Sequence, residues 1–122
     1  MHRTIAALAI AVIGMAGGFA ALAADYPVRS IRLVVPYPPG AGTDGSARIV
    51  ADALSKRLGQ QVVVDNKPGA SGTIGGDFVV KSPPDGYTLL WTSTDSMTAV
   101  PALKGAKVPY RIPEDFTYIG KF

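Results

Sequence analysis

Apolar runs and turn-forming residues follow one another along this chain in a repeated order of strand, loop and helix. Residues 31–35 are mostly aliphatic, which predicts a buried parallel strand. Residues 36–42 hold three prolines and two glycines, so they predict an irregular loop. A helix is predicted to start at Thr43 or Asp44, both good N-cap residues, and to end at Leu58 before Gly59. Its inward face is expected to hold Ala47, Val50, Leu54 and Leu58.

The next segment repeats this order. Residues 61–65 contain three consecutive valines and predict a second short, buried strand, and residues 66–72 read as a turn-rich loop. A second helix is predicted over 73–82, weakened by its paired glycines and ended by Pro83. The side chains expected to point inward are Ile74, Phe78 and Val79.

A third strand is predicted at residues 87–91, followed by a polar run. A short helix is expected to begin at Asp95 or Ser96 and to stop before Pro101, and residues 116–119 are interpreted as the start of a fourth strand. Strands joined by helices predict the α/β class, with a parallel sheet and helical crossovers. Ligands bind such sheets outside the carboxyl ends of the strands, so the loops there are the place to look for function.

The N-terminus has the three parts of a secretory signal peptide. Arg3 is the only charge before an apolar stretch over residues 5–16, and Ala21-Leu22-Ala23 provides a small-residue cleavage site. We expect cleavage after Ala23, which leaves residues 24–122 as one domain in the periplasm. The alternative is an uncleaved membrane anchor, because the stretch up to Ala24 is about long enough to span a bilayer.

Composition removes several classes of function. The sequence has no cysteine, and its one histidine is His2 inside the predicted signal peptide. A Ser-His-Asp triad, a cysteine nucleophile and a His- or Cys-ligated metal site are therefore excluded within the mature chain. Of the 12 basic residues, Arg3 is lost with the signal, leaving 11 against 9 acidic residues, a net charge of +2. That charge is too small and too scattered to predict nucleic-acid binding. We expect no cofactor, no metal and no catalytic residue.

The first loop also satisfies a formal dinucleotide-binding pattern. Gly40, Gly42 and Gly45 form G-x-G-x-x-G after a predicted strand, and Asp65 ends the next strand about twenty residues later. This leaves open an oxidoreductase domain with a Rossmann-like fold. However, Pro36 and the residues after it separate the strand from Gly40, whereas the fingerprint needs a tight turn directly off the strand. A tight turn at Gly40 with the side chain of Asp65 facing it would favour the oxidoreductase interpretation.

Glycines and helix N-termini together can bind an anion through backbone N–H groups without any charged side chain. The second loop adds Ser71 and Thr73 to its glycines, and the third carries a run of hydroxyls. Three such loops at one edge of a sheet favour binding of a small anion, although Gly-rich turns also occur in α/β proteins that bind nothing there. Asp44 has three interpretations: a contact to an amine or hydroxyl of the ligand, a helix cap, which we favour, or an acceptor that hydrogen-bonds the backbone of its own loop.

The whole mature sequence, read in order, resembles the Bug-type receptors, which are the extracytoplasmic solute-binding proteins of tripartite tricarboxylate transporters. The segments that carry the resemblance are Tyr26-Pro27, residues 31–44, Ala47-Arg48, residues 54–60, 62–64, 66–70, 72, 74–75 and 84–90, and Asp115-Phe116. The resemblance implies the first lobe of a type II periplasmic-binding-protein-like fold, which closes on its ligand like a Venus flytrap. It also implies a small organic carboxylate as ligand and a membrane permease of a secondary transporter as partner. We expect a monomer.

Carried over by the resemblance, the ligand would be held by backbone N–H groups and hydroxyls of the three loops. The positions are Tyr37, Gly40, Ala41, Gly42, Thr43, Asp44, Ala70, Ser71, Gly72, Thr73, Thr92, Ser93 and Thr94. Similar receptors are more than twice as long, so we expect the second lobe to be absent from this sequence. A truncated, non-functional exported product remains a further alternative.

Overall fold

The computed structural model describes residues 25–95, 102 and 108–121. The predicted signal peptide, its cleavage after Ala23 and most of the short helix expected before Pro101 lie outside the described residues. Within the described residues, Thr94 and Asp95 are helical. No helix in this part of the chain has the length and apolar character needed to cross a membrane.

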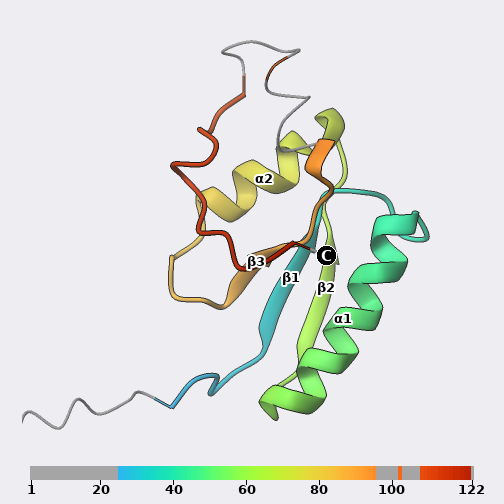
Figure 1. The fold of residues 1–122 in the computed structure, drawn as a ribbon, viewed down its shortest axis with the longest axis vertical. Coiled ribbons are helices and arrows are strands. Elements are labelled where there is room, and N and C mark those ends of the chain that lie inside the picture. Colours follow the sequence, from blue (N-terminus) through green and yellow to red (C-terminus); the bar gives the residue numbers. More distant parts are fainter. Residues whose placement is uncertain (1–24, 96–101, 103–107, 122) are drawn as a thin grey trace, which may run out of the picture.

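The core of the fold is a parallel sheet, as the sequence predicted, and its three strands lie in the order β2-β1-β3 (Figure 1). Leu33 on the central strand pairs with Val64 on one side and Leu89 on the other. The elements are β1 (Ile31–Val35), α1 (Gly42–Leu58), β2 (Val62–Asn66), the 3₁₀ turn η2 (Ala70–Gly72), α2 (Thr73–Val80) and β3 (Thr88–Leu90).

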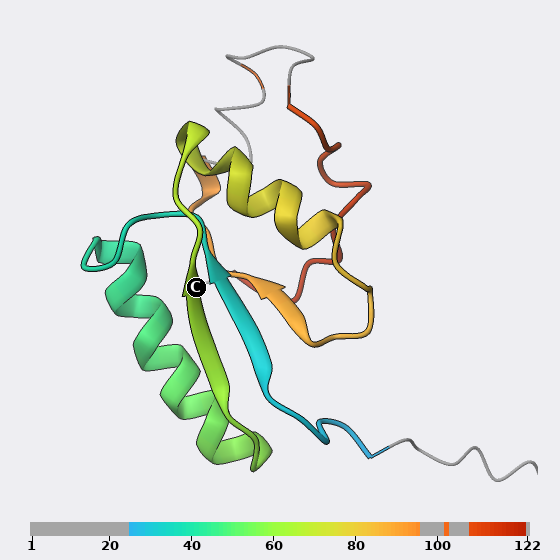
Figure 2. The ribbon, with the colours of Figure 1, turned by 180° about the vertical axis from the view of Figure 1, so that it is seen from behind.

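The two helices cover opposite faces of the sheet, one on either side of the strands (Figures 1 and 2). Successive strand residues point to opposite faces. Leu33 and Val35 belong to the same buried cluster as Ala47 of α1. Arg32 points the other way, where its guanidinium lies 5.5 Å from the ring centroid of Phe78 in α2. Both crossovers can therefore be right-handed although they lead to opposite sides of β1.

Helix α1 packs through its smallest side chains. Ala47 and Ala51 are buried against β1 and β2, whereas Leu58, which we predicted on the inward face, is exposed. Val50 and Leu54 are half-buried. The buried face of α1 is therefore centred on the two alanines rather than on the larger side chains that we predicted. Alanines let the helix approach the valines and leucine of the sheet closely.

Helix α2 packs through glycine, which corrects the sequence prediction for this element. Gly75 and Gly76 are buried, whereas Ile74, predicted to point inward, is 53% exposed. A Cβ on Gly75 would lie 2.7 Å from the Cβ of Pro36, and one on Gly76 would lie 2.6 Å from the hydroxyl of Tyr110. The paired glycines, which we expected only to weaken the helix, permit two close contacts: Gly75 lets α2 approach Pro36 at the end of β1, and Gly76 lets Tyr110 of the C-terminal segment approach α2.

Two further predictions differ from the structure at the sheet edges. The valine strand was predicted to be buried, but Val63 is 45% exposed because β2 is an edge strand. Residues 116–119 were interpreted as a fourth strand, but they form no strand in the structure, and Tyr118 and Ile119 are exposed. A short β-rich run becomes a strand only where a neighbouring strand supplies its hydrogen bonds.

Candidate functional site

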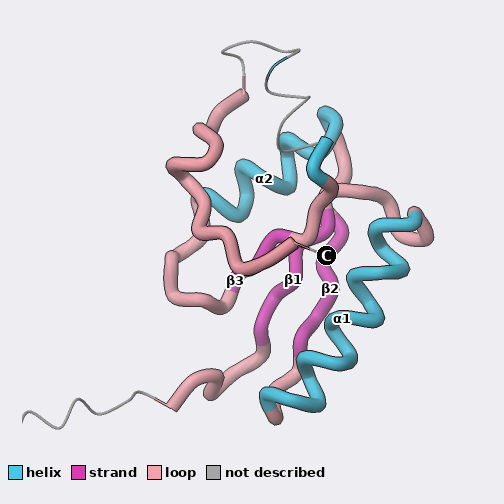
Figure 3. The backbone as a smooth tube through the Cα atoms, viewed as in Figure 1, coloured by secondary structure: helices cyan, strands magenta, loops and turns pink. Residues whose placement is uncertain are grey.

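Three loops leave the sheet at its carboxyl edge, where the sequence placed the site (Figure 3). The first runs from Pro36 to Ala41, the second leads from Lys67 into η2, and the third begins at Trp91. In the order β2-β1-β3, the crossover after β1 passes over one face of the sheet and the crossover after β2 passes over the other. Such a switch point opens a crevice in which α/β proteins bind ligands.

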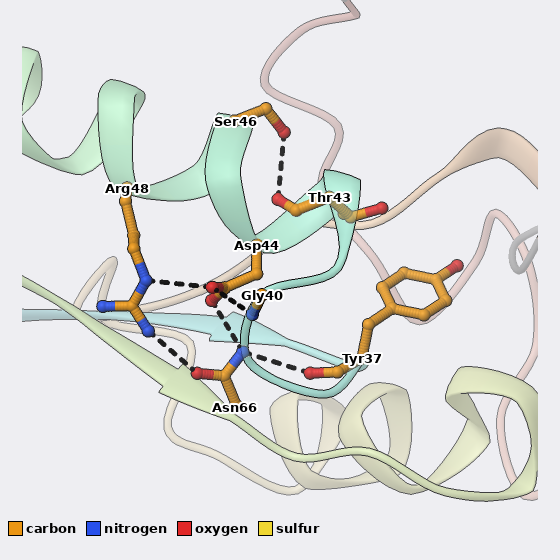
Figure 4. Close-up of polar contacts among 7 residues, drawn as sticks. All are labelled: Tyr37, Gly40, Thr43, Asp44, Ser46, Arg48 and Asn66. Carbon is orange, nitrogen blue, oxygen red and sulfur yellow. Dashed lines mark hydrogen bonds and ion pairs between the residues drawn. The ribbon is translucent and has the colours of Figure 1, made fainter.

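The carboxylate of Asp44 fixes the first loop (Figure 4). Its Oδ2 accepts hydrogen bonds from the backbone N–H of Gly40 at 2.9 Å and from Nε of Arg48 at 3.0 Å. Its Oδ1 accepts one from Nδ2 of Asn66 at 2.9 Å. The side chain therefore holds its own loop, as the third interpretation of Asp44 predicted, and it also joins the loop to the end of β2; the favoured interpretation as a helix cap is wrong.

Asp44 is buried, with 3% of its surface exposed, yet it is stabilised as an anion. The hydrogen bond from Arg48 is the main cause that lowers its pKa from 3.8 to about 2, and the bonds from Gly40 and Asn66 add to it. Burial alone would raise this pKa, so the donors outweigh the loss of solvent. This buried carboxylate already accepts three hydrogen bonds from the protein, and its negative charge would repel an anionic ligand.

Helix α1 begins at Gly42, earlier than the start that we predicted at Thr43 or Asp44. Ala41 is the N-cap and supplies no side-chain cap. The first helical hydrogen bond runs from the N–H of Gly45 to the carbonyl of Ala41 at 3.1 Å. The amides of residues 42–44 precede that bond, as the first N–H groups of every helix do, and can donate to a ligand at the carboxyl edge.

The second loop holds an unusual backbone. Gly69, Ala70, Ser71 and Gly72 all have positive φ angles, of 127°, 47°, 56° and 91°. Positive φ is uncommon for Ala and Ser and costs of order 1–3 kcal/mol for each such residue. Strain of this kind gathers at functional sites, so the segment retains its place in the candidate site.

The third loop is joined to the first and to α1. The hydroxyls of Tyr37 and Ser93 are 2.7 Å apart, which links the ends of β1 and β3 across the switch point. Nε1 of Trp91 donates to Oγ of Ser46 in α1 at 3.1 Å. Oγ1 of Thr92 is buried and has no hydrogen-bond partner among the described residues. The structure thus brings Tyr37 and Ser93 together, as one site would require, whereas Thr94 is exposed.

The dinucleotide alternative gains no support from this geometry. Asp65 would have to face the glycines of the first loop, but its carboxylate lies 3.7 Å from Nε of Arg32 and 3.4 Å from Nζ of Lys67. Lys67 in turn lies over the ring of Phe78, so this group is on the α2 face, opposite α1. No cluster of acidic side chains suited to a metal ion occurs in the described part of the chain.

The sequence did not single out three residues of this candidate site. Asn66 and Arg48 complete the hydrogen bonds of Asp44, and Ser46 accepts the indole N–H. Two signals could have found the first pair. Asn66 lies at the carboxyl end of a predicted strand, and Arg48 is one helical turn after Asp44.

Known proteins resemble this chain in both sequence and structure. Residues 46–122 match the family described as tripartite tricarboxylate transporter family receptor. Protein BugT of Bordetella pertussis (strain Tohama I / ATCC BAA-589 / NCTC 13251) is 46% identical over 116 residues, which are 94% of this chain and 35% of BugT.

Solved structures agree with that assignment. A periplasmic transporter is 44% identical, with a TM-score of 0.68 over 70% of this chain and 28% of its own. The R. palustris protein Rpa4515, solved with adipate, is 46% identical, with a TM-score of 0.52 over 53% of this chain and 22% of its own. The type II binding-protein fold expected from the resemblance is confirmed, and the matching family is one of substrate receptors rather than enzymes. The chain spans about a third of BugT, and it belongs to the tripartite tricarboxylate transporter receptor family.

Proposed function

We propose that this chain forms one lobe of an extracytoplasmic receptor that binds a small carboxylate for a membrane permease of the tripartite type. In this proposal residues 1–23 are a signal peptide that is cut after Ala23, and the receptor acts in the periplasm as a monomer. The observation that carries the proposal is the switch point at the carboxyl edge. There a fixed first loop, the start of α1 and a hydroxyl pair from β1 and β3 lie together.

The donors at this edge are neutral. The amides of residues 42–44 carry the partial positive charge of a helix start, and Tyr37, Thr92 and Ser93 offer hydroxyls. No lysine or arginine is among the positions expected to hold the ligand. A carboxylate is satisfied by a few neutral donors, and the adipate in the R. palustris relative is a ligand of this class.

The proposed site is one wall of a cleft. Flytrap receptors bury the ligand between two lobes, and burial strengthens each hydrogen bond by excluding water. One lobe supplies only part of these contacts. We therefore expect this chain alone to bind adipate with a dissociation constant of about 1 mM or weaker, which corresponds to about 4 kcal/mol or less.

Amide NMR of the full chain under titration with adipate tests this proposal, because it detects weak binding and locates it. Shifts are expected at the amides of residues 40–44, 70–73 and 92–94. The neutral diamide of adipate should cause much smaller shifts. Ser93→Ala should weaken the response, whereas Ser82→Ala should not, because Ser82 bonds the carbonyl of Phe78 at the far end of α2.

Two outcomes would contradict the proposal. Shifts that gather away from the carboxyl edge would place the ligand elsewhere. Micromolar binding by this chain alone, measured by calorimetry, would show that a second lobe is not needed.

A further inference from the structure

Asn66 is the residue through which β2 reaches the first loop. Its Nδ2 donates to the backbone carbonyl of Tyr37 at 3.1 Å and to Oδ1 of Asp44 at 2.9 Å (Figure 4). Its Oδ1 accepts from Nη2 of Arg48 at 3.3 Å. Both hydrogens of the amide group are therefore used, and the carbonyl oxygen has its own donor.

These bonds hold the first loop near both of its ends. Asn66 holds the carbonyl of Tyr37 near the beginning, and Asp44, which Asn66 also contacts, holds the N–H of Gly40 near the end. The residues between the two are exposed prolines, which make no hydrogen bond through nitrogen. Within the loop, the N–H of Ala41 donates to the carbonyl of Pro38 at 3.3 Å, but the attachment of the loop to β2 and α1 depends on one amide and one carboxylate.

Only an amide satisfies this position. A carboxylate at position 66 would place negative oxygens against the carbonyl of Tyr37 and the anion of Asp44. An apolar side chain would leave Oδ1 of Asp44 buried without its donor, which is costly for a charged group. An amide is also uncharged, so it adds no negative charge to the site.

We propose that Asn66 is a positioning residue, which sets the first loop and the start of α1 in the ligand-binding arrangement before any carboxylate arrives. This inference rests on the proposed function. Its physical basis is preorganisation: a loop that is already ordered loses less entropy when the ligand binds. The same arrangement turns the charge of Asp44 towards Arg48 and Asn66, so that the amides of residues 42–44 can meet an anion.

Ser55 provides a matched control, because it joins the same two elements at their other end. Its hydroxyl accepts the N–H of Val62 at 2.8 Å, which ties the start of β2 to the last turns of α1. Ser55→Ala removes a β2–α1 contact without touching the carboxyl edge. An effect seen in both Asn66→Asp and Ser55→Ala comes from a general weakening of the β2–α1 contact. An effect seen only in Asn66→Asp comes from the loss of the bonds that hold the first loop.

The test compares wild type, Asn66→Asp and Ser55→Ala in the full chain, with Asn66→Ser as a milder variant should the aspartate prevent folding. NMR relaxation of the amides of residues 40–42 reports loop order without ligand, and adipate titration reports affinity. Asn66→Asp is expected to make these amides mobile and to weaken adipate binding about tenfold, the effect of losing hydrogen bonds to a charged group. Ser55→Ala is expected to leave both loop order and adipate affinity unchanged. Urea denaturation of each variant records how much stability it has lost.

Each contrary result has its own meaning. Loop amides as ordered in Asn66→Asp as in wild type would overturn the positioning role, as would equal loop mobility in Ser55→Ala. If the wild type shows no response to adipate, the proposed function fails, whereas the ligand-free relaxation comparison still decides the role of Asn66.

Discussion

The contact between α2 and the sheet can be tested by adding one methyl group. In Gly75→Ala the new Cβ would lie 2.7 Å from Cβ of Pro36, 3.1 Å from its Cα and 3.2 Å from the backbone carbonyl of Lys67. Two of these three atoms are backbone, and Pro36 is fully buried, so none of them can rotate away. The helix must move off the sheet or strain it.

The expected magnitude follows from two opposing terms. Replacing glycine by alanine inside a helix stabilises it by about 1 kcal/mol. Overpacking of this kind costs about 1–3 kcal/mol. Gly75→Ala is therefore expected to lower the free energy of unfolding by about 1 kcal/mol, because the packing term exceeds the helical gain.

Gly45→Ala separates the two terms. Gly45 lies in α1 and is exposed, and a methyl group added there would meet no atom within 4 Å apart from its own helix backbone and chain neighbours. This variant is expected to gain the helical term alone and to be more stable than wild type. The difference between the two variants is then the packing cost itself.

Urea denaturation measures both variants, with the fluorescence of Trp91, the single tryptophan, as the signal. If Gly75→Ala proves as stable as Gly45→Ala, α2 does not pack on Pro36 and the close approach inferred above is wrong. A loss of stability in both variants would instead show that replacing glycine by alanine does not stabilise these helices as expected.

Three further predictions follow from particular contacts. The pKa of Asp44 is about 2 in the folded protein and near 3.8 in the unfolded chain, so its contribution to stability is complete above about pH 4 and is lost as the pH falls towards 2. Asp44→Asn should therefore flatten this acid part of the stability profile measured by urea denaturation. The smaller pH dependence that remains comes from Asp115, whose pKa is also lowered. Burial raises the pKa of Tyr110, so stability should fall as the pH rises above 10, and an unchanged alkaline profile in Tyr110→Phe would contradict this. Ser46→Ala removes the hydrogen bond from the indole of Trp91 and should lower the free energy of unfolding by about 1 kcal/mol, with a shift in tryptophan emission as the direct check.

The elements of this fold were largely readable from local pattern. The aliphatic run at 31–35, the caps and breakers around α1, and the loop glycines predict their elements because each depends on residues close in sequence. The predicted helix over 73–82 is present, although it ends at Val80. Errors occurred at ends and faces, such as the N-cap assigned to Thr43 or Asp44 where the structure uses Ala41.

The meeting of the three loops at one edge of the sheet was predictable from the sequence, and the contacts between them were less so. Parallel strands place their carboxyl ends at one edge, so the three loops follow from the strand assignment. Asn66 lies 22 residues from Asp44, and nothing local links the two. The pair forms only because β2 lies beside β1 and α1 covers them both.

The sequence alone determined three strands, two helices and the parallel arrangement of the sheet, because periodicity, capping and chain-breaking residues act over a few positions. Only the tertiary structure decided which side chains are buried and which polar groups meet. It turned Ile74 outward and the glycines of α2 inward, and it made Asp44 a support of its loop. Burial and hydrogen bonding depend on what faces a residue from another element, and that is decided when the sheet and its helices pack together.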